Sequence, residues 1–447
     1  MRPDPAPELG ARRILALWWP LALSWLLMGV ELPLFTACVA RMPDAKVQLA
    51  AYGSLVFPLA LVIEAPIMML LAAATALAGD AESWGRVRRF THKAGAALTA
   101  LHVGLAFTPL FDALALRVFQ VPPEVVEPAR LGLRLMTPWT WSIAYRRANQ
   151  GVLIRHERGR PVVIGTCVRL FGNGLVYALG FALLARGHAL PGIAVGASAV
   201  ACGVLSEALF IGWCTRRLLS ESKLPERPVG PSLSRADFLR FYVPLALTPL
   251  IALVTQPIGT AAMARMRDPL DSLAAWPAVH GLSFLVRTGG FAFNEVVLSL
   301  AGLPGARRAL VRFALGLGAA SSLVLLAFTA TPMAELWFAR VSGLPPELAE
   351  LAAGAAVLGI AWPFSQALQS WFQGALVRAR RTRYATEAMV VFFVVVASVL
   401  TLGVRATDWP GAPWAVLALS AASLSQTGWL AWRQRRVQAE ASPQGQH

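Results

Sequence analysis

The chain has 447 residues, of which 56% are hydrophobic and only 14% carry a charge. A water-soluble domain of this size needs far more polar surface, so the composition excludes an ordinary soluble enzyme. The net charge of +16 would suit a nucleic-acid-binding protein, but the basic residues stand in short clusters between long apolar runs. That placement is typical of a membrane protein, and we expect no nucleic-acid partner.

Apolar runs follow one another along the whole chain, and each is long enough to cross a bilayer as a helix. Helices are required because an unpaired backbone group in lipid costs several kcal/mol. We therefore predict an all-α polytopic membrane protein with about 12 transmembrane helices. The expected spans are 14–40, 47–78, 94–118, 130–155, 162–185, 189–215, 237–264, 272–301, 309–331, 347–376, 384–404 and 412–432.

Basic residues distinguish the two sides of the membrane. One set of connections, together with both termini, contains 28 Lys and Arg residues, and the opposite set contains 9. The larger set includes Arg146 and Arg147, which we place at the inner end of the fourth span. Because basic loops stay in the cytoplasm, we expect a multi-pass protein of the plasma (inner) membrane with both termini cytoplasmic.

Short motifs of the first half recur in the second half at a nearly constant offset. Pro20-Leu-Ala-Leu23 returns as Pro244-Leu-Ala-Leu247, and Gln150-Gly-Val-Leu-Ile-Arg155 returns as Gln373-Gly-Ala-Leu-Val-Arg378. Matches that keep their order and spacing indicate an internal duplication. Six spans per half make parallel repeats, which are related by an axis along the membrane normal and usually leave the substrate path between them.

The duplication predicts two pseudo-symmetric six-helix bundles joined by a Pro- and Ser-rich segment. We expect an N-terminal bundle over 1–217, a cytoplasmic linker over 218–234, a C-terminal bundle over 235–433 and a cytoplasmic tail over 434–447.

Ionisable residues inside the spans are candidates for the transport pathway, because each costs about 2.5–3.5 kcal/mol on insertion scales. Glu31 stands between Gly29 and Pro33, where the first helix can bend. Glu64 lies midway along the second helix, and its counterpart at the spacing of the repeated Gln-Gly motif is Arg287. These opposite charges could pair directly, or each could line the pathway with a partner of its own.

The remaining polar residues in the spans leave two interpretations open. Arg134 could hold an anion by bidentate hydrogen bonds, whereas for Arg169 we favour a side chain that extends to the cytoplasmic interface. Glu207, Glu295 and Glu387 lie closer to span ends and are expected to be structural, as is the doubled Gln150/Gln373 element. Amides could either contact a polar solute or join helices. The amide candidates for the pathway are Gln256, Asn294 and Gln366.

The doubled Gln-Gly-x-Leu-x-Arg element resembles the Gln-Gly-x-Leu-Arg element of the MATE multidrug exporters. Other stretches resemble the progressive ankylosis (ANK) family, and both families belong to the MOP superfamily. That resemblance implies two six-helix bundles with alternating access between them. MATE exporters use Na⁺ or H⁺ gradients to expel mostly cations, whereas ANK proteins are associated with export of small organic anions. The ANK-like stretches are Trp19-Pro-Leu-Ala-Leu23, Leu49-Ala-Ala-Tyr-Gly53, Gly151-Val-Leu-Ile-Arg-His156, and Pro244-Leu-Ala-Leu247 followed by Pro257-Ile258 and Arg265.

We therefore expect a secondary active exporter of small organic ions, with organic anions favoured over cations. The alternatives are a MATE-type cation antiporter, a lipid flippase, and a major-facilitator-type transporter, whose loop is faintly similar to Glu82-Ser-Trp-Gly-Arg-Val-Arg-Arg89. No phosphate-binding loop, metal-ligand spacing or nucleophile–base set is present in the sequence, so we expect no enzyme activity, cofactor or metal. We also expect coupling to H⁺ or Na⁺ and a monomeric protein.

Overall fold

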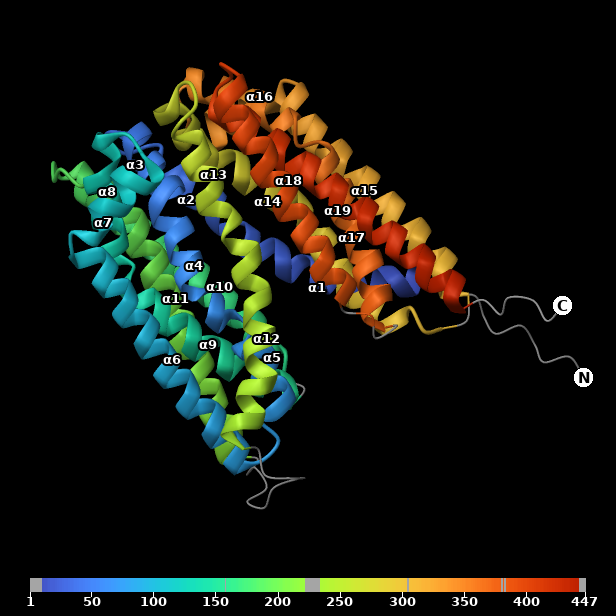
Figure 1. Ribbon diagram of the computed structural model, residues 1–447. Helices are drawn as coiled ribbons and strands as arrows, with labels where there is room; N and C mark the ends of the chain where they lie inside the picture. Colours follow the sequence, from blue (N-terminus) through green and yellow to red (C-terminus); the bar gives the residue numbers. More distant parts are fainter. Residues whose placement is uncertain are drawn as a thin grey trace, which may run out of the picture. The chain divides into compact units, whose positions relative to one another are not determined.

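A computed structural model describes residues 10–156, 158–221, 234–303, 305–378, 381 and 383–441 (Figure 1). Within these ranges the chain forms α-helices and three short π-helical segments, with no β-strand and a single isolated bridge between Arg267 and Pro410. The predicted all-α class is therefore confirmed. Most of the expected linker lies outside the described residues, and the expected tail begins within a helix that continues to Ala441.

The chain divides into two compact units, which are described separately. Unit 1 combines Met1–Ala37 with Met266–His447, and unit 2 is Cys38–Arg265. This division differs from the expected bundles of 1–217 and 235–433, because the first helix of each half belongs to the unit that contains the rest of the other half. The six-plus-six arrangement of bundles stays a prediction.

Unit 2 begins with the second span of the chain and ends with the first helices of the second half. Its elements are α3 (Ala45–Ala51), η1 (Tyr52–Val56), α4 (Phe57–Met68), α5 (Leu70–Leu77), α6 (Ala81–Phe107), α7 (Leu110–Asp112), η2 (Ala113–Phe119), α8 (Pro123–Leu135), α9 (Thr137–Arg155), α10 (Arg160–Ala185), α11 (Gly192–Glu221), α12 (Arg235–Leu253) and α13 (Thr255–Met263).

Unit 1 contains the corresponding elements of the second half together with the first helix of the chain. They are α1 (Ala11–Gly29), α2 (Glu31–Val39, whose last two residues fall in unit 2), α14 (Pro269–Leu300), α15 (Ala306–Ala330), η3 (Glu335–Val341), α16 (Pro346–Val357), α17 (Ala361–Arg378), α18 (Arg383–Ala406) and α19 (Gly411–Ala441).

Helix boundaries repeat at the offset of the sequence motifs, which confirms the duplication. The first and last residues of α1 and of α12 are separated by the same offset as Pro20 and Pro244, and so are those of α2 and α13. Asp44 and Asp268, which also correspond at this offset, both adopt left-handed backbone with φ of 52° and 50°. Each of these aspartates precedes the first residue of a helix, so the same turn connects the first and second spans of both halves.

Among the residues that the structure describes, six helical segments are long and apolar enough to cross a membrane, and two bent helix pairs would raise that number to eight. The pairs bend by 81° between α6 and α7–η2 and by 43° between α16 and α17. Other long helices, such as α9 and α14, are less apolar because charged side chains interrupt them. The single segments are Ala11–Val39, Ala45–Leu77, Arg160–Ala185, Gly192–Glu221, Ala306–Ala330 and Arg383–Ala406.

Helix faces show which side of a span packs inside its unit. On α10, Phe171, Leu175 and Leu179 recur every four residues and are 69%, 56% and 60% exposed, as expected of a stripe that faces lipid. The opposite side of this helix buries Arg169 and Asn173. The inversion of the soluble pattern, with polar groups inside and apolar groups outside, is what a bilayer demands of a polytopic chain.

The glycine of each repeated Gln-Gly element sets the distance between its own helix and a neighbouring helix. A Cβ built on Gly151 of α9 would lie 2.6 Å from the Cβ of Ala74 on α5, and one built on Gly374 of α17 would lie 2.6 Å from Val297 of α14. Arg155 then donates hydrogen bonds to the carbonyls of Thr75 and Ala76 at the end of α5. These contacts support the architectural interpretation of the doubled element.

Candidate functional site

Arg287 of α14 lies inside unit 1 against the side chains of α17. Its Nη2 donates a hydrogen bond of 2.6 Å to Oε1 of Gln366 on α17. The centre of its guanidinium lies 4.2 Å from the ring centroid of Trp362 and 5.3 Å from that of Phe291. Its Nε–H is buried without an acceptor, and no ion pair to Arg287 is found among the described residues. The arginine is thus held by an amide and two ring faces.

Close packing of α17 on α14 creates this arrangement. A Cβ on Gly290 would lie 2.8 Å from Cγ of Gln366, so only glycine lets the two helices approach this closely. Ser370, one helical turn beyond Gln366, donates a hydrogen bond of 2.7 Å to the carbonyl of Gly290. Trp362, Gln366 and Ser370 therefore share the face of α17 that covers Arg287. The structure brings together two of the predicted pathway residues, Arg287 and Gln366.

A buried ionic network joins three helices inside unit 2. Arg146 of α9 donates a hydrogen bond of 2.6 Å to Oε2 of Glu207 on α11, and Gln150 donates one of 3.1 Å to Oε1. Arg169 of α10 places its Nη1 3.7 Å from the same Oε2. The exposed fractions of Arg146, Glu207 and Arg169 are 4%, 0% and 5%. A charge buried to this extent in a membrane helix needs such partners.

Arg147 and Glu64 extend the charged interior of unit 2. Glu64 of α4 is 2% exposed, and Arg147 interacts electrostatically with both Glu64 and Glu207. The Nε–H of Arg147 is buried without an acceptor among the described residues. Three guanidinium groups therefore accompany two carboxylates, so positive charge is in excess within this group.

The equivalent helix contact in unit 1 is neutral. Gln369, the counterpart of Arg146 in the repeat, donates hydrogen bonds of 3.0 Å to the carbonyl and the hydroxyl of Ser423 and one of 3.1 Å to Oγ1 of Thr427. Both contacts link the fourth span of a half to its sixth span. Only the first half uses an ion pair there, so helix packing alone does not require the charges.

The other predicted site residues are spread over both units. Glu31 is the first residue of α2, which only Val30 separates from α1, and the bend expected beside Gly29 stays a prediction. Arg134 donates to the carbonyl of Ala106 at 3.1 Å and covers the ring of Phe107. Their roles in a pathway stay predictions.

The two remaining amides also lie in different units. Asn294 of α14 approaches Gly374, and its Oδ1 is buried without a hydrogen bond among the described residues. Gln256 lies on α13, half-buried in unit 2. Glu64 and Arg287 belong to different units, so their direct pairing stays a prediction.

Several expectations about charged residues were wrong. Arg146 and Arg147 are not part of a cytoplasmic connection but lie in the middle of α9. Arg169 does not extend to the interface, because it is buried against Glu207, which itself lies in the middle of α11 rather than near its end. The sequence carried a signal for this network: both arginines of α9 fall inside the span expected over 130–155.

Glu387 matches the structural interpretation. Glu387 of α18 forms ion pairs of 3.2 Å with Arg383 and 2.6 Å with Arg433, and Arg433 also covers the ring of Trp432. These contacts attach α18 to α19. Glu295 is exposed on α14, and its structural role stays a prediction.

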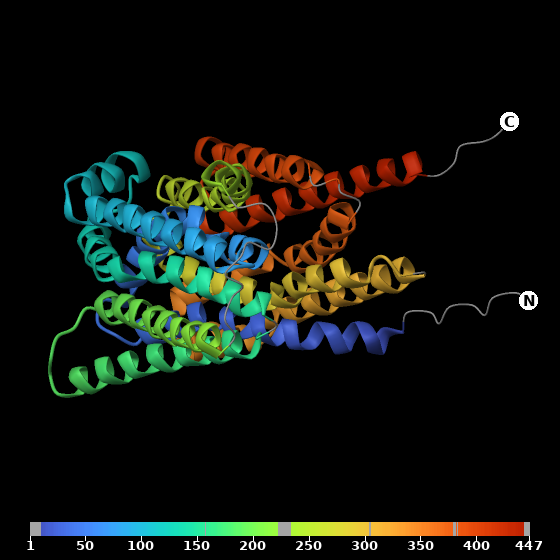
Figure 2. The same ribbon diagram turned by 90° about the horizontal axis from the view of Figure 1, so that it is seen from below.

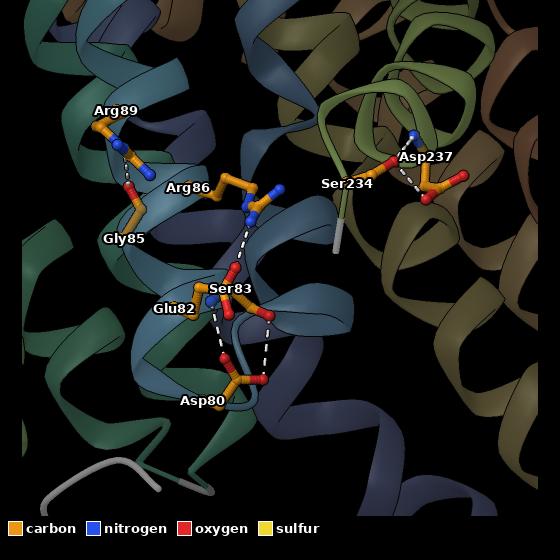
Figure 3. Close-up of polar contacts among 8 residues, drawn as sticks. All are labelled: Asp80, Glu82, Ser83, Gly85, Arg86, Arg89, Ser234 and Asp237. Carbon is orange, nitrogen blue, oxygen red and sulfur yellow. Dashed lines mark hydrogen bonds and ion pairs between the residues drawn. The ribbon is translucent and has the colours of Figure 1, made fainter. Parts of the chain in front are cut away.

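The loop with faint major-facilitator similarity has a local structural role (Figure 3). Asp80 caps α6 by accepting hydrogen bonds from the backbone N–H of Ser83 at 2.8 Å and from its hydroxyl at 3.0 Å, and Glu82 pairs with Arg86 one turn later. Ser234 caps α12 in the same way through the N–H of Asp237. Capping explains these polar residues without a functional assignment.

No protein-family model and no curated protein matches the sequence. Solved structures do match along nearly the whole chain. An inward-facing multidrug resistance MATE family transporter of the MOP superfamily has a TM-score of 0.72 at 15% identity, covering 98% of this chain and 100% of that chain. A MOP superfamily transporter from Pyrococcus furiosus, described as having a binding pocket of reverse polarity, has a TM-score of 0.63 at 15% identity, covering 97% of this chain and 99% of that chain.

The lipid II flippase MurJ in an inward closed conformation also matches, with a TM-score of 0.68 at 12% identity over 93% of this chain and 87% of that chain. Identities this low establish a shared architecture and nothing finer. The chain therefore has the helical membrane fold common to these MATE, MOP-superfamily and MurJ structures.

Proposed function

We propose that this protein is a secondary active transporter that moves small organic anions across a membrane by alternating access. The observation that carries the proposal is Arg287, a guanidinium inside a membrane helix whose contacts are an amide and two aromatic rings. In the middle of a membrane-spanning helix an arginine costs about 2.5–3.5 kcal/mol on insertion scales. Charged residues within membrane spans are rare and usually mark a substrate or ion pathway.

A substrate carboxylate or phosphate would supply the negative charge that Arg287 lacks. Its buried Nε–H has no acceptor among the described residues, so an oxyanion bound beside it would complete the hydrogen bonding of the guanidinium. Arginine binds carboxylate and phosphate through two parallel N–H···O bonds, which gives both charge neutralisation and orientation. The carbonyl oxygen of Gln366 already orients the other side of the fork.

The excess of arginine over carboxylate inside unit 2 supports the same substrate charge. A buried carboxylate can become neutral by taking up a proton, whereas an arginine stays charged. We further propose that proton or Na⁺ movement through Glu31 or Glu64 couples to transport. We propose that the chain acts as a monomer in the plasma (inner) membrane with both termini cytoplasmic.

Proteoliposome transport tests the proposal. Wild-type protein should move citrate or a nucleotide and not ethidium, and Arg287→Gln should reduce anion transport by roughly tenfold or more because the oxyanion loses a charged bidentate partner. Arg287→Lys should retain part of the activity, since lysine keeps the charge but not the fork. Arg435→Gln removes an exposed arginine at the end of α19 and should have no effect. If the wild type did transport ethidium, and Arg287→Gln transported it equally well, the anion proposal would be contradicted and a MATE-type cation antiporter favoured.

A lipid flippase is the second candidate, favoured by the match to MurJ over most of both chains. The anion of such a substrate would be a lipid-linked phosphate, which an arginine also binds. Translocation of a fluorescent polyprenyl phosphate in the same vesicles, together with failure to move citrate, would support the flippase and contradict transport of a soluble anion.

A further inference from the structure

A groove of about 560 Å³ runs between the N-terminal parts of α1 and α15 in unit 1. Figure 2 shows these two helices beside each other, α1 in blue and α15 in gold. Ile14, Leu15 and Trp18 of α1 form one wall of the groove. Arg308 and Arg312, both exposed on the first turns of α15, stand at one end.

The rest of the α15 wall is apolar, and a glycine leaves part of it without a side chain. Beyond Arg312 the lining continues through Gly316 and Leu317 to Ala320. Arg308 and Ala320 are therefore about 18 Å apart along the helix axis at 1.5 Å per residue. A Cβ on Gly316 would meet no atom within 4 Å, so the groove is open at this glycine. The groove thus has a cationic end and a long apolar end.

A comparison with the equivalent helix pair explains why this space exists. In unit 2, the rings of Phe90, Phe238 and Tyr242 contact one another at centroid distances of 4.8, 4.9 and 5.5 Å. At the repeat offsets, their counterparts in unit 1 are Phe313, Ile14 and Trp18. The smaller Ile14 replaces the central phenylalanine, and the three-ring contact is reduced to one pair between Trp18 and Phe313 at 5.7 Å.

We infer that this groove binds an anionic phospholipid, with its phosphate at Arg308 and Arg312 and one acyl chain along Gly316 and Ala320. Two arginines at the end of an apolar groove match a molecule that is anionic at one end and apolar over the rest. Arg12 and Arg13 at the start of α1 add positive charge at the same end of that helix. Basic clusters next to the apolar part of a span attract anionic lipids.

A free phosphate or small organic anion fits the observations less well. Both arginines are exposed, so water competes for a small ion there, whereas an acyl chain in the groove adds apolar burial that a free ion lacks. This site is separate from Arg287, which faces α17, and the inference does not rest on the proposed transport function.

Native mass spectrometry of the delipidated full chain tests the inference with dioleoylphosphatidylglycerol against dioleoylphosphatidylcholine. The wild type should retain one phosphatidylglycerol per chain in clear preference to phosphatidylcholine. The double variant Arg308→Gln/Arg312→Gln should weaken that retention by roughly tenfold, since each arginine near a lipid surface contributes several-fold to binding. Arg307→Gln, on the same turn but outside the groove lining, is the matched control and should retain the lipid.

Gly316→Leu provides a second test that leaves every charge in place. Its side chain would fill the apolar end, so phosphatidylglycerol retention should fall while the protein still elutes as a monodisperse species. This variant decides the question if the double arginine variant does not fold. Equal retention of the two lipids by the wild type, unchanged retention in Gly316→Leu, or displacement of the lipid by inorganic phosphate at millimolar concentration would each overturn the inference.

Discussion

Trp18 and Tyr242, which occupy corresponding positions in the two halves of the chain, make equivalent hydrogen bonds in the two units. Trp18 donates its Nε1–H to the carbonyl of Gly289 on α14 at 2.8 Å, and Tyr242 donates its hydroxyl to the carbonyl of Pro66 on α4. Gly289 and Pro66 are themselves counterparts at the spacing of the repeated Gln-Gly motif. The first helix of each half is thus attached at the same point to the second span of the other half.

Removing either hydrogen bond should loosen a first helix while keeping its ring contacts. We expect Trp18→Phe and Tyr242→Phe each to lower the free energy of unfolding by about 0.5–1.5 kcal/mol, because a carbonyl inside a membrane helix loses a donor. Unfolding in mixed micelles measures the change. Trp19→Phe and Phe241→Leu alter exposed neighbours on the same helices and should be nearly neutral. Equal losses in all four variants would mean that the bonds have no particular role.

The Arg146–Glu207 ion pair should be costly to break from one side. Glu207→Gln leaves two buried arginines without their carboxylate, and we expect a loss of about 3–5 kcal/mol in unfolding free energy. The measurement is the same unfolding transition, followed with size-exclusion chromatography to detect misfolded protein.

The neutral contact in unit 1 supplies a matched rescue. Arg146→Gln combined with Glu207→Gln introduces the residue types of Gln369, the counterpart of Arg146, and of Gln426, which lies as far from the start of α19 as Glu207 lies from the start of α11. The double variant should be more stable than Glu207→Gln alone, because both buried charges of the pair are removed together. A double variant that is less stable than the single one would show that the ion pair is not the main contribution of Glu207.

Glycine at position 151 should be required for helix packing. In Gly151→Ala the new Cβ would overlap the carbonyl oxygen of Leu71 and approach Ala74, so we expect a loss of about 1–3 kcal/mol from overpacking. Gly104→Ala on α6 meets no atom within 4 Å and should be neutral or stabilising, since alanine has the higher helix propensity. Thermal unfolding of both variants in detergent compares them. If Gly151→Ala were as stable as Gly104→Ala, the packing role of the repeated element would be wrong.

Cysteine labelling tests the orientation of the chain in the membrane. With Arg146 and Arg147 inside α9, the basic residues divide 26 to 9, which still predicts cytoplasmic termini. Ser83 is buried against Asp80 and Ser232 lies outside the described residues, so Glu82 is the better position for the label. In a background without the four native cysteines, Glu82→Cys should resist an impermeant maleimide in intact cells, whereas His188→Cys should react. The reverse pattern would invert the topology.

Glu31 and Glu64 are expected to serve transport. Glu31→Gln and Glu64→Gln should each greatly reduce substrate movement in proteoliposomes while membrane insertion is retained, because an amide keeps the shape but cannot exchange a proton or bind a cation as tightly. Glu64→Gln should also lower the free energy of unfolding, since Arg147 then interacts with only one of its two carboxylates. Glu387→Gln, which breaks contacts with Arg383 and Arg433, is the structural control and should affect stability more than transport. Normal transport by both pathway variants would make the two carboxylates incidental.

The helical class and the duplication could be predicted because they depend on local features. Apolar run length and recurring motifs require no knowledge of tertiary contacts, and the repeated helix bounds match them. Breaks within spans were only partly visible. The expected span 47–78 is divided at Met69, shortly after Pro66, but the π-helical turn at Tyr52–Val56 has no comparable signal in the sequence.

The candidate site was less accessible because it depends on which helices meet. Arg287 and Gln366 stand far apart in the sequence, and nothing in either segment identifies the other as a partner. Trp362 carries no signal of its own in the sequence, since an aromatic residue in an apolar helix is usually packing. Adjacent arginines such as Arg146 and Arg147 are typical of a helix end, and that rule fails where Glu207 provides buried compensation.

The exchange of first helices changes what the linker does. A half that begins with α1 or α12 sends that helix to the other unit, so two separate half-chains would assemble as a domain-swapped dimer. Cutting the chain within 222–233 should therefore leave the fragments bound to each other, since each fragment contributes a helix to both units. The linker acts mainly by raising the effective concentration of one half near the other, and its length and sequence can vary widely without loss of the assembled protein.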